Sequence, residues 1–293
     1  MDPMTIVAAT DFSDMACAAV ERAALIARKH EAQLTLIYAF DETRWENLRS
    51  LAKPKKNLFA DQPVKHAWTK IRAVADQLSR KYGIIVTGVV AMGHASEAIA
   101  STAAAVHASL IVLGPHVGRL GDRLYLGSTA LGAARGATCP VLVVRNRPKA
   151  EYLRCLAGVD FSPPSQRAAT AAARLFPSVA ITLLHAVQSV EGPMLFTGAL
   201  REAIDTAKAA LRVQAQERLA RLFPAGQPGR LDSARRRAVI GSAQIALQRA
   251  LQSGKFDVVV LGRDAKAALN ERVLGSVPAN MLLNAPTDVL IVP

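Results

Sequence analysis

Two sets of residues that suit a bound nucleotide follow one another along the chain in the same order. Each set has an aspartate after its first predicted strand, an alanine after the second, a glycine after the third, and a glycine and a Gly-Ser pair after the fourth. The second set repeats the first at an offset of about 148 residues, which indicates an internal duplication. The two sets are Asp11, Ala39, Gly93, Gly114, Gly127 and Ser128, and then Asp160, Ala186, Gly241, Gly262, Gly275 and Ser276.

The Gly-Ser pairs precede predicted helices, and a helix start is a site for anions. Its first backbone amides have no partner inside the helix, glycine allows a phosphate to come close, and the serine hydroxyl can donate to a phosphate oxygen. A small alanine at a strand end leaves backbone open to a flat base, and an aspartate can accept from a ribose hydroxyl or a base amine. The alternative is that each Gly-Ser pair is only a turn and a helix cap. The recurrence of the whole set favours a mononucleotide pocket.

The hydrophobic pattern predicts the scaffold that would gather these residues. Short, nearly all-apolar runs alternate with helical patterns, which is typical of parallel strands covered on both faces. The fold class is therefore α/β, with two tandem open, doubly wound, five-stranded parallel sheets, and ligands should bind beyond the carboxyl ends of the strands. Ser13 and Ser96 are expected to cap helices. Strands are expected at 5–9, 34–38, 84–90, 110–113, 141–144, 154–157, 181–185, 237–240, 258–261 and 289–292, and helices at 14–30, 64–82, 96–106, 129–134 and 200–222.

The repeat also predicts the domain organisation. A short polar stretch with a proline, around Pro148, separates the copies and suggests domains at 1–147 and 151–293. The segment 41–63 is either an ordered lid or a loose loop over the first site.

The chain resembles the universal stress protein family in these motifs. The family has an aspartate closing the first strand, often as Asp-Phe-Ser, then Gly-x2-Gly-x9-Gly-Ser/Thr after the fourth strand, and a final strand similar to Pro-Val-Leu-Val-Val. Here Asp11-Phe12-Ser13 and Asp160-Phe161-Ser162 match the first motif, and Pro140-Val141-Leu142-Val143-Val144 matches the last. The resemblance covers nearly the whole chain and is strongest to two-domain members.

The resemblance implies a regulatory stress-response protein with strand order 3-2-1-4-5, of the adenine nucleotide alpha hydrolase-like type. Some members bind ATP, which could come with Mg²⁺. In those members the aspartate and the end of the second strand meet the adenine, the first loop glycine lies near the ribose, and the later glycines and Gly-Ser meet the phosphates. The resemblance also implies that the last strands, 141–144 and 289–292, pair as an intrachain pseudo-dimer. A homodimer of the whole chain is left open.

The second loop glycine of the family is absent from both copies. Val117 stands there in the first copy and Ala265 in the second. A β-branched valine resists the positive φ that glycine adopts freely. The second copy is therefore expected to bind ATP more tightly than the first.

The composition favours some classes of protein over others. Lys and Arg number 36 against 23 Asp and Glu, a net charge of +13, and aromatic residues make up 5%. The positive charge would attract polyanions, but few rings are available to stack on bases, so nucleic acid is not the expected partner. Neither a membrane span nor a signal peptide is predicted, and the three cysteines form no CxxC, so a cytoplasmic protein is expected. Cys17 is expected in the core.

Two other functions compete with nucleotide binding. The chain could be a nucleotide-free scaffold whose basic surface meets nucleic acid or an acidic protein, which would account for the positive charge and the missing loop glycines. An adenylating enzyme of a related sheet fold is the third class, but no nucleophile with a positioned base is apparent. No enzymatic activity is expected beyond slow ATP hydrolysis.

Overall fold

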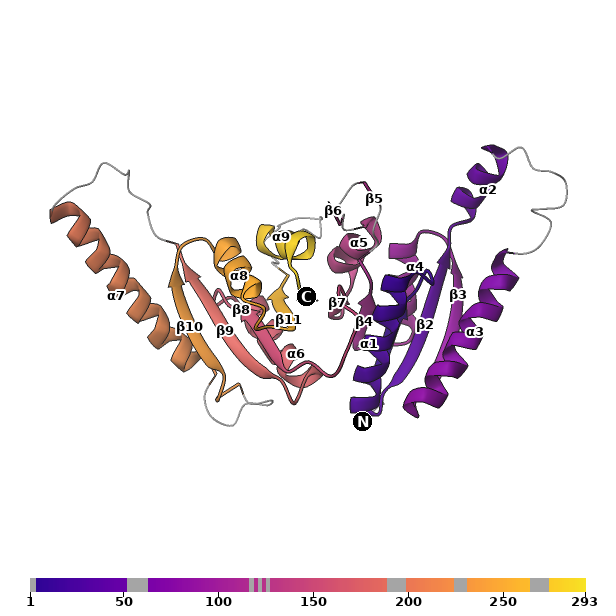
Figure 1. Cartoon of the computed structure of the whole chain (residues 1–293), viewed down its shortest axis with the longest axis horizontal. Helices are drawn as coiled ribbons and strands as arrows, with labels where there is room; N and C mark the ends of the chain where they lie inside the picture. Colours follow the sequence, from indigo (N-terminus) through magenta and orange to yellow (C-terminus); the bar gives the residue numbers. More distant parts are fainter. Residues whose placement is uncertain are drawn as a thin grey trace. The chain divides into compact units, whose positions relative to one another are not determined.

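The computed structural model describes residues 4–51, 63–115, 119–120, 123–124, 127–188, 199–223, 231–263 and 274–293. The chain divides into two compact units, Met1–Glu151 and Tyr152–Pro293. Each unit contains one parallel sheet with helices on both of its faces (Figure 1). The α/β class predicted from the alternating pattern is confirmed.

In the first unit the five parallel strands lie in the order β3-β2-β1-β4-β7. Helices α1 and α3 pack together on one face, and α4 and α5 pack together on the other. Two antiparallel strands of two residues each precede α5, and they were not predicted. The elements are β1 (Thr5–Ala9), α1 (Asp14–His30), β2 (Gln33–Phe40), α2 (Glu42–Leu51), α3 (Pro63–Tyr82), β3 (Val86–Met92), α4 (Ala95–Ala105), β4 (Leu110–Leu113), β5 (Arg119–Leu120), β6 (Arg123–Leu124), α5 (Ser128–Gly136) and β7 (Val141–Val143).

The second unit repeats this arrangement with the order β10-β9-β8-β11-β12. Both units therefore show the 3-2-1-4-5 order that the family resemblance implied. The elements are β8 (Arg154–Gly158), α6 (Pro163–Leu175), β9 (Ala180–Val187), α7 (Ala199–Leu222), β10 (Arg235–Ile240), α8 (Ala243–Gln252), β11 (Val258–Gly262), α9 (Ser276–Asn284) and β12 (Asp288–Val292).

The central strands form because nearly all their side chains are apolar and can be buried on both faces of the sheet. All four residues of β4, a central strand of its unit, are buried between two helical layers. Helix α1 lies close to the sheet because alanines fill its inner face; Ala19, Ala23 and Ala27 are fully buried.

One question left open by the sequence is answered in part, and two local predictions are wrong. Segment 41–63 begins with a helix, α2, and only residues 52–62 lie outside the described chain. Helix α4 is capped at His94 rather than at Ser96, because the helix starts at Ala95. Cys17 is exposed rather than in the core, because it lies on the solvent side of α1 between the buried Ala16 and Ala18.

The outer edge of β10 is occupied by the side chain of Gln216 from α7. Its Nε2 donates to the Arg236 carbonyl at 3.0 Å, and its Oε1 accepts from the Ala238 amide at 3.0 Å. A residue of a neighbouring strand would make the same two bonds, so Gln216 blocks strand addition at this point.

Replacing Gln216 with alanine should cost about 1 kcal/mol and increase self-association, because two backbone groups lose their partners and the edge opens. Urea unfolding followed by circular dichroism would measure the first effect and light scattering the second. Gln214→Ala, an exposed glutamine on the same helix, is the control. Equal behaviour of the two variants would contradict the blocking role.

Candidate functional site

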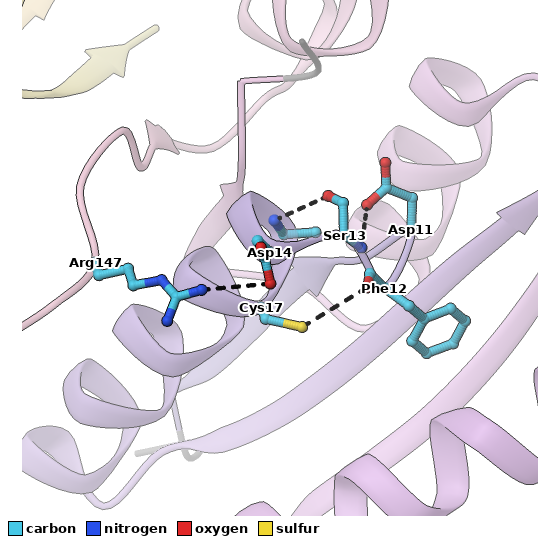
Figure 2. Close-up of polar contacts among 7 residues, drawn as sticks. Asp11, Phe12, Ser13, Asp14, Cys17 and Arg147 are labelled. Carbon is cyan, nitrogen blue, oxygen red and sulfur yellow. Dashed lines mark hydrogen bonds and ion pairs between the residues drawn. The ribbon is translucent and has the colours of Figure 1, made fainter.

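Each Asp-Phe-Ser motif forms a tight turn between the first strand of its unit and the following helix. In the first unit the Asp11 carboxylate accepts from the Ser13 amide at 2.9 Å, and Ser13 Oγ accepts from the Ala16 amide at 3.3 Å, which caps α1 as predicted (Figure 2). Between them Phe12 has a φ of 63°, which is rare for a side chain of this size. The motif therefore sets the backbone path at the site as well as supplying a carboxylate.

The second copy forms the same turn with more hydrogen bonds. The Asp160 carboxylate accepts from the Ser162 amide at 3.0 Å and from the Ser162 hydroxyl, and Phe161 has a φ of 65°. Burial acts to raise the pKa of Asp160, but the hydrogen bonds, first from the Ser162 hydroxyl, outweigh it and hold the pKa below its usual value. Asp160 is thus an anionic acceptor at neutral pH.

A cavity of about 360 Å³ opens beyond the carboxyl ends of the strands in the first unit. Its walls come from the β1–α1 turn, the end of β2, the start of α4, the end of β4 and the start of α5. Four predicted residues meet there, and the structure adds others that the sequence analysis did not assign. The predicted residues are Asp11, Ala39, Gly114 and Ser128, and the additional polar ones include Tyr38, Asp41, His94, Ser96 and Thr129.

The equivalent cavity of the second unit is smaller, about 170 Å³. Five predicted residues line it: Asp160, Ala186, Gly262, Gly275 and Ser276. Gly275 and Ser276 begin α9, as predicted, so first-turn amides of that helix face the cavity region.

Three predicted glycines do not line these cavities. Gly93 and Gly241 have φ values of 107° and 126°, and each makes the turn between the third strand and the next helix. Gly127 is the N-cap of α5, beside Ser128. These glycines shape the backbone of the rim. His94 and Ser128, which follow Gly93 and Gly127, line the first cavity, whereas Ser242, which follows Gly241, does not line the second.

Gly114 and Gly262 are required for close packing. A Cβ on Gly114 would lie 3.1 Å from the Met15 carbonyl group, and a Cβ on Gly262 would lie 2.5 Å from that of Pro164. Both contacts bring the end of the fourth strand against the helix that follows the Asp-Phe-Ser turn. These glycines therefore hold two walls of each cavity together.

A cation and two rings stack beside each cavity. Lys70 lies over Phe12, 4.5 Å from the ring centroid, and Phe12 stacks on Tyr38 at 5.1 Å. In the second unit Arg218 lies over Phe161 at 4.1 Å, and Phe161 contacts His185 at 4.4 Å.

Burial, and then the negative charge of Asp11, raise the pKa of Tyr38, so its hydroxyl stays protonated. His185 Nδ1 lies 2.7 Å from the Val159 carbonyl and donates to it, so the ring orientation is set by backbone.

The first site also contains an Asp–His pair. His94 Nδ1 lies 3.0 Å from Asp41 Oδ2, and both residues line the cavity. Sequence spacing alone did not pair them, because Asp41 follows β2 and His94 follows β3. The available signal was position: each comes directly after a strand that ends at the same rim.

The described residues contain no group of three or more His, Cys, Asp or Glu side chains that could hold a metal ion. Within the same part of the chain, no helix is both long and apolar enough to cross a membrane.

Comparison with known proteins agrees with the duplicated fold. A family model for the universal stress protein family matches residues 4–145 and 151–293. A universal stress protein of Methanocaldococcus jannaschii is 31% identical over 156 residues, covering 50% of this chain and 84% of its own.

Two solved structures are similar over the whole chain. One is a universal stress protein from Archaeoglobus fulgidus (TM-score 0.65, 13% identity, covering 100% of this chain and 99% of the other). The other is a putative universal stress protein from Pseudomonas aeruginosa (TM-score 0.66, 19% identity, covering 99% and 93%). At these identities the structures support the fold alone. With its two matches to the family model and the Asp-Phe-Ser and Gly-Ser motifs in both units, the chain belongs to the universal stress protein family.

Proposed function

We propose that this protein is a regulatory, stress-related member of its family that binds ATP and acts through the bound state rather than by turnover. The observation that carries this proposal is the cavity of about 360 Å³ in the first unit, where Asp11, Ala39, Gly114 and Ser128 meet from four separate segments. Its volume lies within the range of about 300–1,000 Å³ that is usual for ligand pockets. A strand-end rim beside a helix start is where nucleotides bind in open α/β sheets.

The side chains suggest how ATP would be divided among the walls. The adenine would lie by Asp11 and the backbone of Ala39, and the ribose by Gly114. The phosphates would lie at the start of α5, where Ser128 and Thr129 line the cavity. A Mg²⁺ ion arriving with ATP would be coordinated mainly by phosphate oxygens and water.

We propose that the first unit binds ATP more tightly than the second, the reverse of the ranking that Val117 suggested. The first cavity has about twice the volume of the second, and it contains the Asp41–His94 pair. The corresponding positions of the second unit have no such pair, because Ser242 follows Gly241 where His94 follows Gly93 in the first unit. Val117 and Ala265 lie outside the described residues.

Replacing Ser128 with aspartate should weaken ATP binding to the first site at least about tenfold, because a carboxylate would face the phosphates. The change should not unfold α5, since a negative charge stabilises a helix N-terminus. Isothermal titration calorimetry of the full chain would measure the affinities for ATP and for adenosine. Adenosine affinity should be unchanged, because adenosine lacks phosphate.

Ser276→Asp is the matched variant for the second site and should remove only the weaker binding event. Ser128→Ala controls for loss of the hydroxyl without added charge. Two results would contradict the proposal: an ATP affinity that Ser128→Asp leaves unchanged, or wild-type protein that binds no adenine nucleotide. The second result would favour the scaffold function.

Pairing of the final strands as a pseudo-dimer, homodimer formation and the cytoplasmic location stay predictions. Size-exclusion chromatography with light scattering would test the homodimer.

A further inference from the structure

The second unit has a basic groove outside both proposed nucleotide sites. We define it by β10, β9 and α8; its volume is about 1120 Å³. It follows β10, a strand of six residues, and is therefore about 20 Å long. Among the described lining residues, only Leu184 is shared with the second nucleotide cavity.

The run Arg235-Arg236-Arg237 is divided between the two faces of the sheet. Arg235 and Arg237 are exposed and line the groove. Arg236 points to the opposite face, where its guanidinium donates to five backbone carbonyls around the end of α7. Strand geometry requires this alternation, so the run has two functions: the middle arginine is structural and its neighbours are available to a ligand.

Three further basic residues line the groove. Arg249 projects from α8, Lys255 follows that helix, and Arg154 lies at the start of β8. None of the described lining residues is Asp or Glu. Arg154 does have an acidic neighbour, Asp257, at 3.7 Å, so the net charge of the groove rests mainly on Arg235, Arg237, Arg249 and Lys255.

Three arginines of the groove occur only in the second unit. When Gly241 is matched to Gly93, Arg235, Arg237 and Arg249 correspond to Thr87, Val89 and Ser101. The same fold thus forms without these arginines, and packing of the sheet does not require them.

The remaining lining mixes aliphatic and hydroxyl side chains and contains little that would stack on a base. Val239, Leu184 and the half-exposed Ile245 contribute aliphatic surface. Phe256 is the one aromatic residue of the described lining, whereas proteins that bind single strands stack several bases on rings. The edge of β10 is blocked by Gln216, so a ligand would lie on the face of the strand rather than extend the sheet.

We propose that this groove binds an extended acidic segment of a partner protein. Arg235 and Arg237 are two residues apart on a strand, a spacing of about 6.6 Å that equals the spacing of alternate side chains in an extended peptide. Alternate Glu or Asp side chains would therefore meet the two guanidinium groups in register, and Arg249 would contact the segment from the helix side. Guanidinium and carboxylate groups form charge-assisted, bidentate hydrogen bonds, and the aliphatic lining accepts intervening apolar side chains.

The test measures binding of labelled probes to the full chain by fluorescence anisotropy at physiological salt. The probe is a peptide of alternating Glu and Val; its twin has Gln in place of Glu, and oligouridine of similar length represents nucleic acid. The Glu peptide should bind at least about tenfold more tightly than its Gln twin. Arg235→Gln, Arg237→Gln and Arg249→Gln combined should weaken binding of the Glu peptide at least about tenfold.

A matched control distinguishes this groove from the general positive charge. Arg201→Gln, Arg212→Gln and Arg221→Gln remove the same charge from exposed positions of α7 in the same unit, and should change affinity less than twofold. Arg249→Glu alone, at an exposed helix position, covers the case in which the triple variant does not fold, and it should also weaken binding. ATP affinity should be unchanged in all groove variants, so this test is independent of the proposed nucleotide function.

The proposal is overturned by equal losses in the two triple variants, by equal binding of the Glu and Gln peptides, or by no peptide binding. It is also overturned if oligouridine binds more tightly than the peptide and depends on the same arginines, because the groove would then be a nucleic-acid site.

Discussion

Replacing Gly262 with alanine is expected to destabilise the second unit by about 3 kcal/mol. The added Cβ would lie 2.5 Å from the carbonyl carbon and oxygen of Pro164 and 2.8 Å from the Ser165 amide nitrogen. These are backbone atoms at the start of α6, so no side-chain rotation can relieve the overlap. Helix α6 would have to move away from the end of β11, and that movement would also disturb the second nucleotide cavity.

Gly114→Ala is the matched variant in the first unit. Its Cβ would lie 3.1 Å from the Met15 carbonyl group, a tight contact that a small shift can relieve, so a loss of about 1 kcal/mol is expected. Both tryptophans, Trp45 and Trp68, belong to the first unit. Tryptophan fluorescence during urea unfolding therefore reports the first unit, and circular dichroism reports both. A Gly262→Ala protein as stable as wild type would show that the close contact is not required.

Arg236→Met should destabilise the second unit by about 2–3 kcal/mol. The guanidinium donates to the carbonyls of Leu219 and Phe223 at the end of α7, and to those of Leu231, Asp232 and Ala234 in the segment before β10. Methionine retains much of the aliphatic packing but none of the five hydrogen bonds. The carbonyls at the helix end would also lose the positive charge that their dipole favours.

Arg235→Met is the control for Arg236→Met, because it removes the same group from the next residue on the exposed face. Its stability should lie within about 0.5 kcal/mol of wild type. The stability of Arg236→Lys should lie between those of the two methionine variants, because one ammonium group cannot reach all five carbonyls. Urea unfolding monitored by circular dichroism would rank the variants. Equal effects at positions 235 and 236 would contradict the division of the arginine run between the faces.

The sequence predicted the central strands and the first helix more accurately than helices α2 and α4. Strands β1 and β4 and helix α1 were predicted to the residue, because uninterrupted apolar runs and a serine N-cap are local signals. Helix α2 was not distinguished from a loop, since its residues carry only a weak apolar pattern. The start of α4 was misplaced by one residue, because His94 takes the cap position without a side-chain hydrogen bond.

The sequence by itself determined the duplication, the parallel α/β class, the order of elements and nine of the residues that line the two cavities. These follow from periodicity and from residue types at strand ends, which are properties of short segments. Only the tertiary structure decided that Asp41 meets His94, that Gly262 serves a close backbone approach, and that Arg236 is structural while Arg235 and Arg237 line a groove. The physical reason is that each of these depends on contacts between segments far apart in the chain, and no local pattern encodes which side chains will meet there.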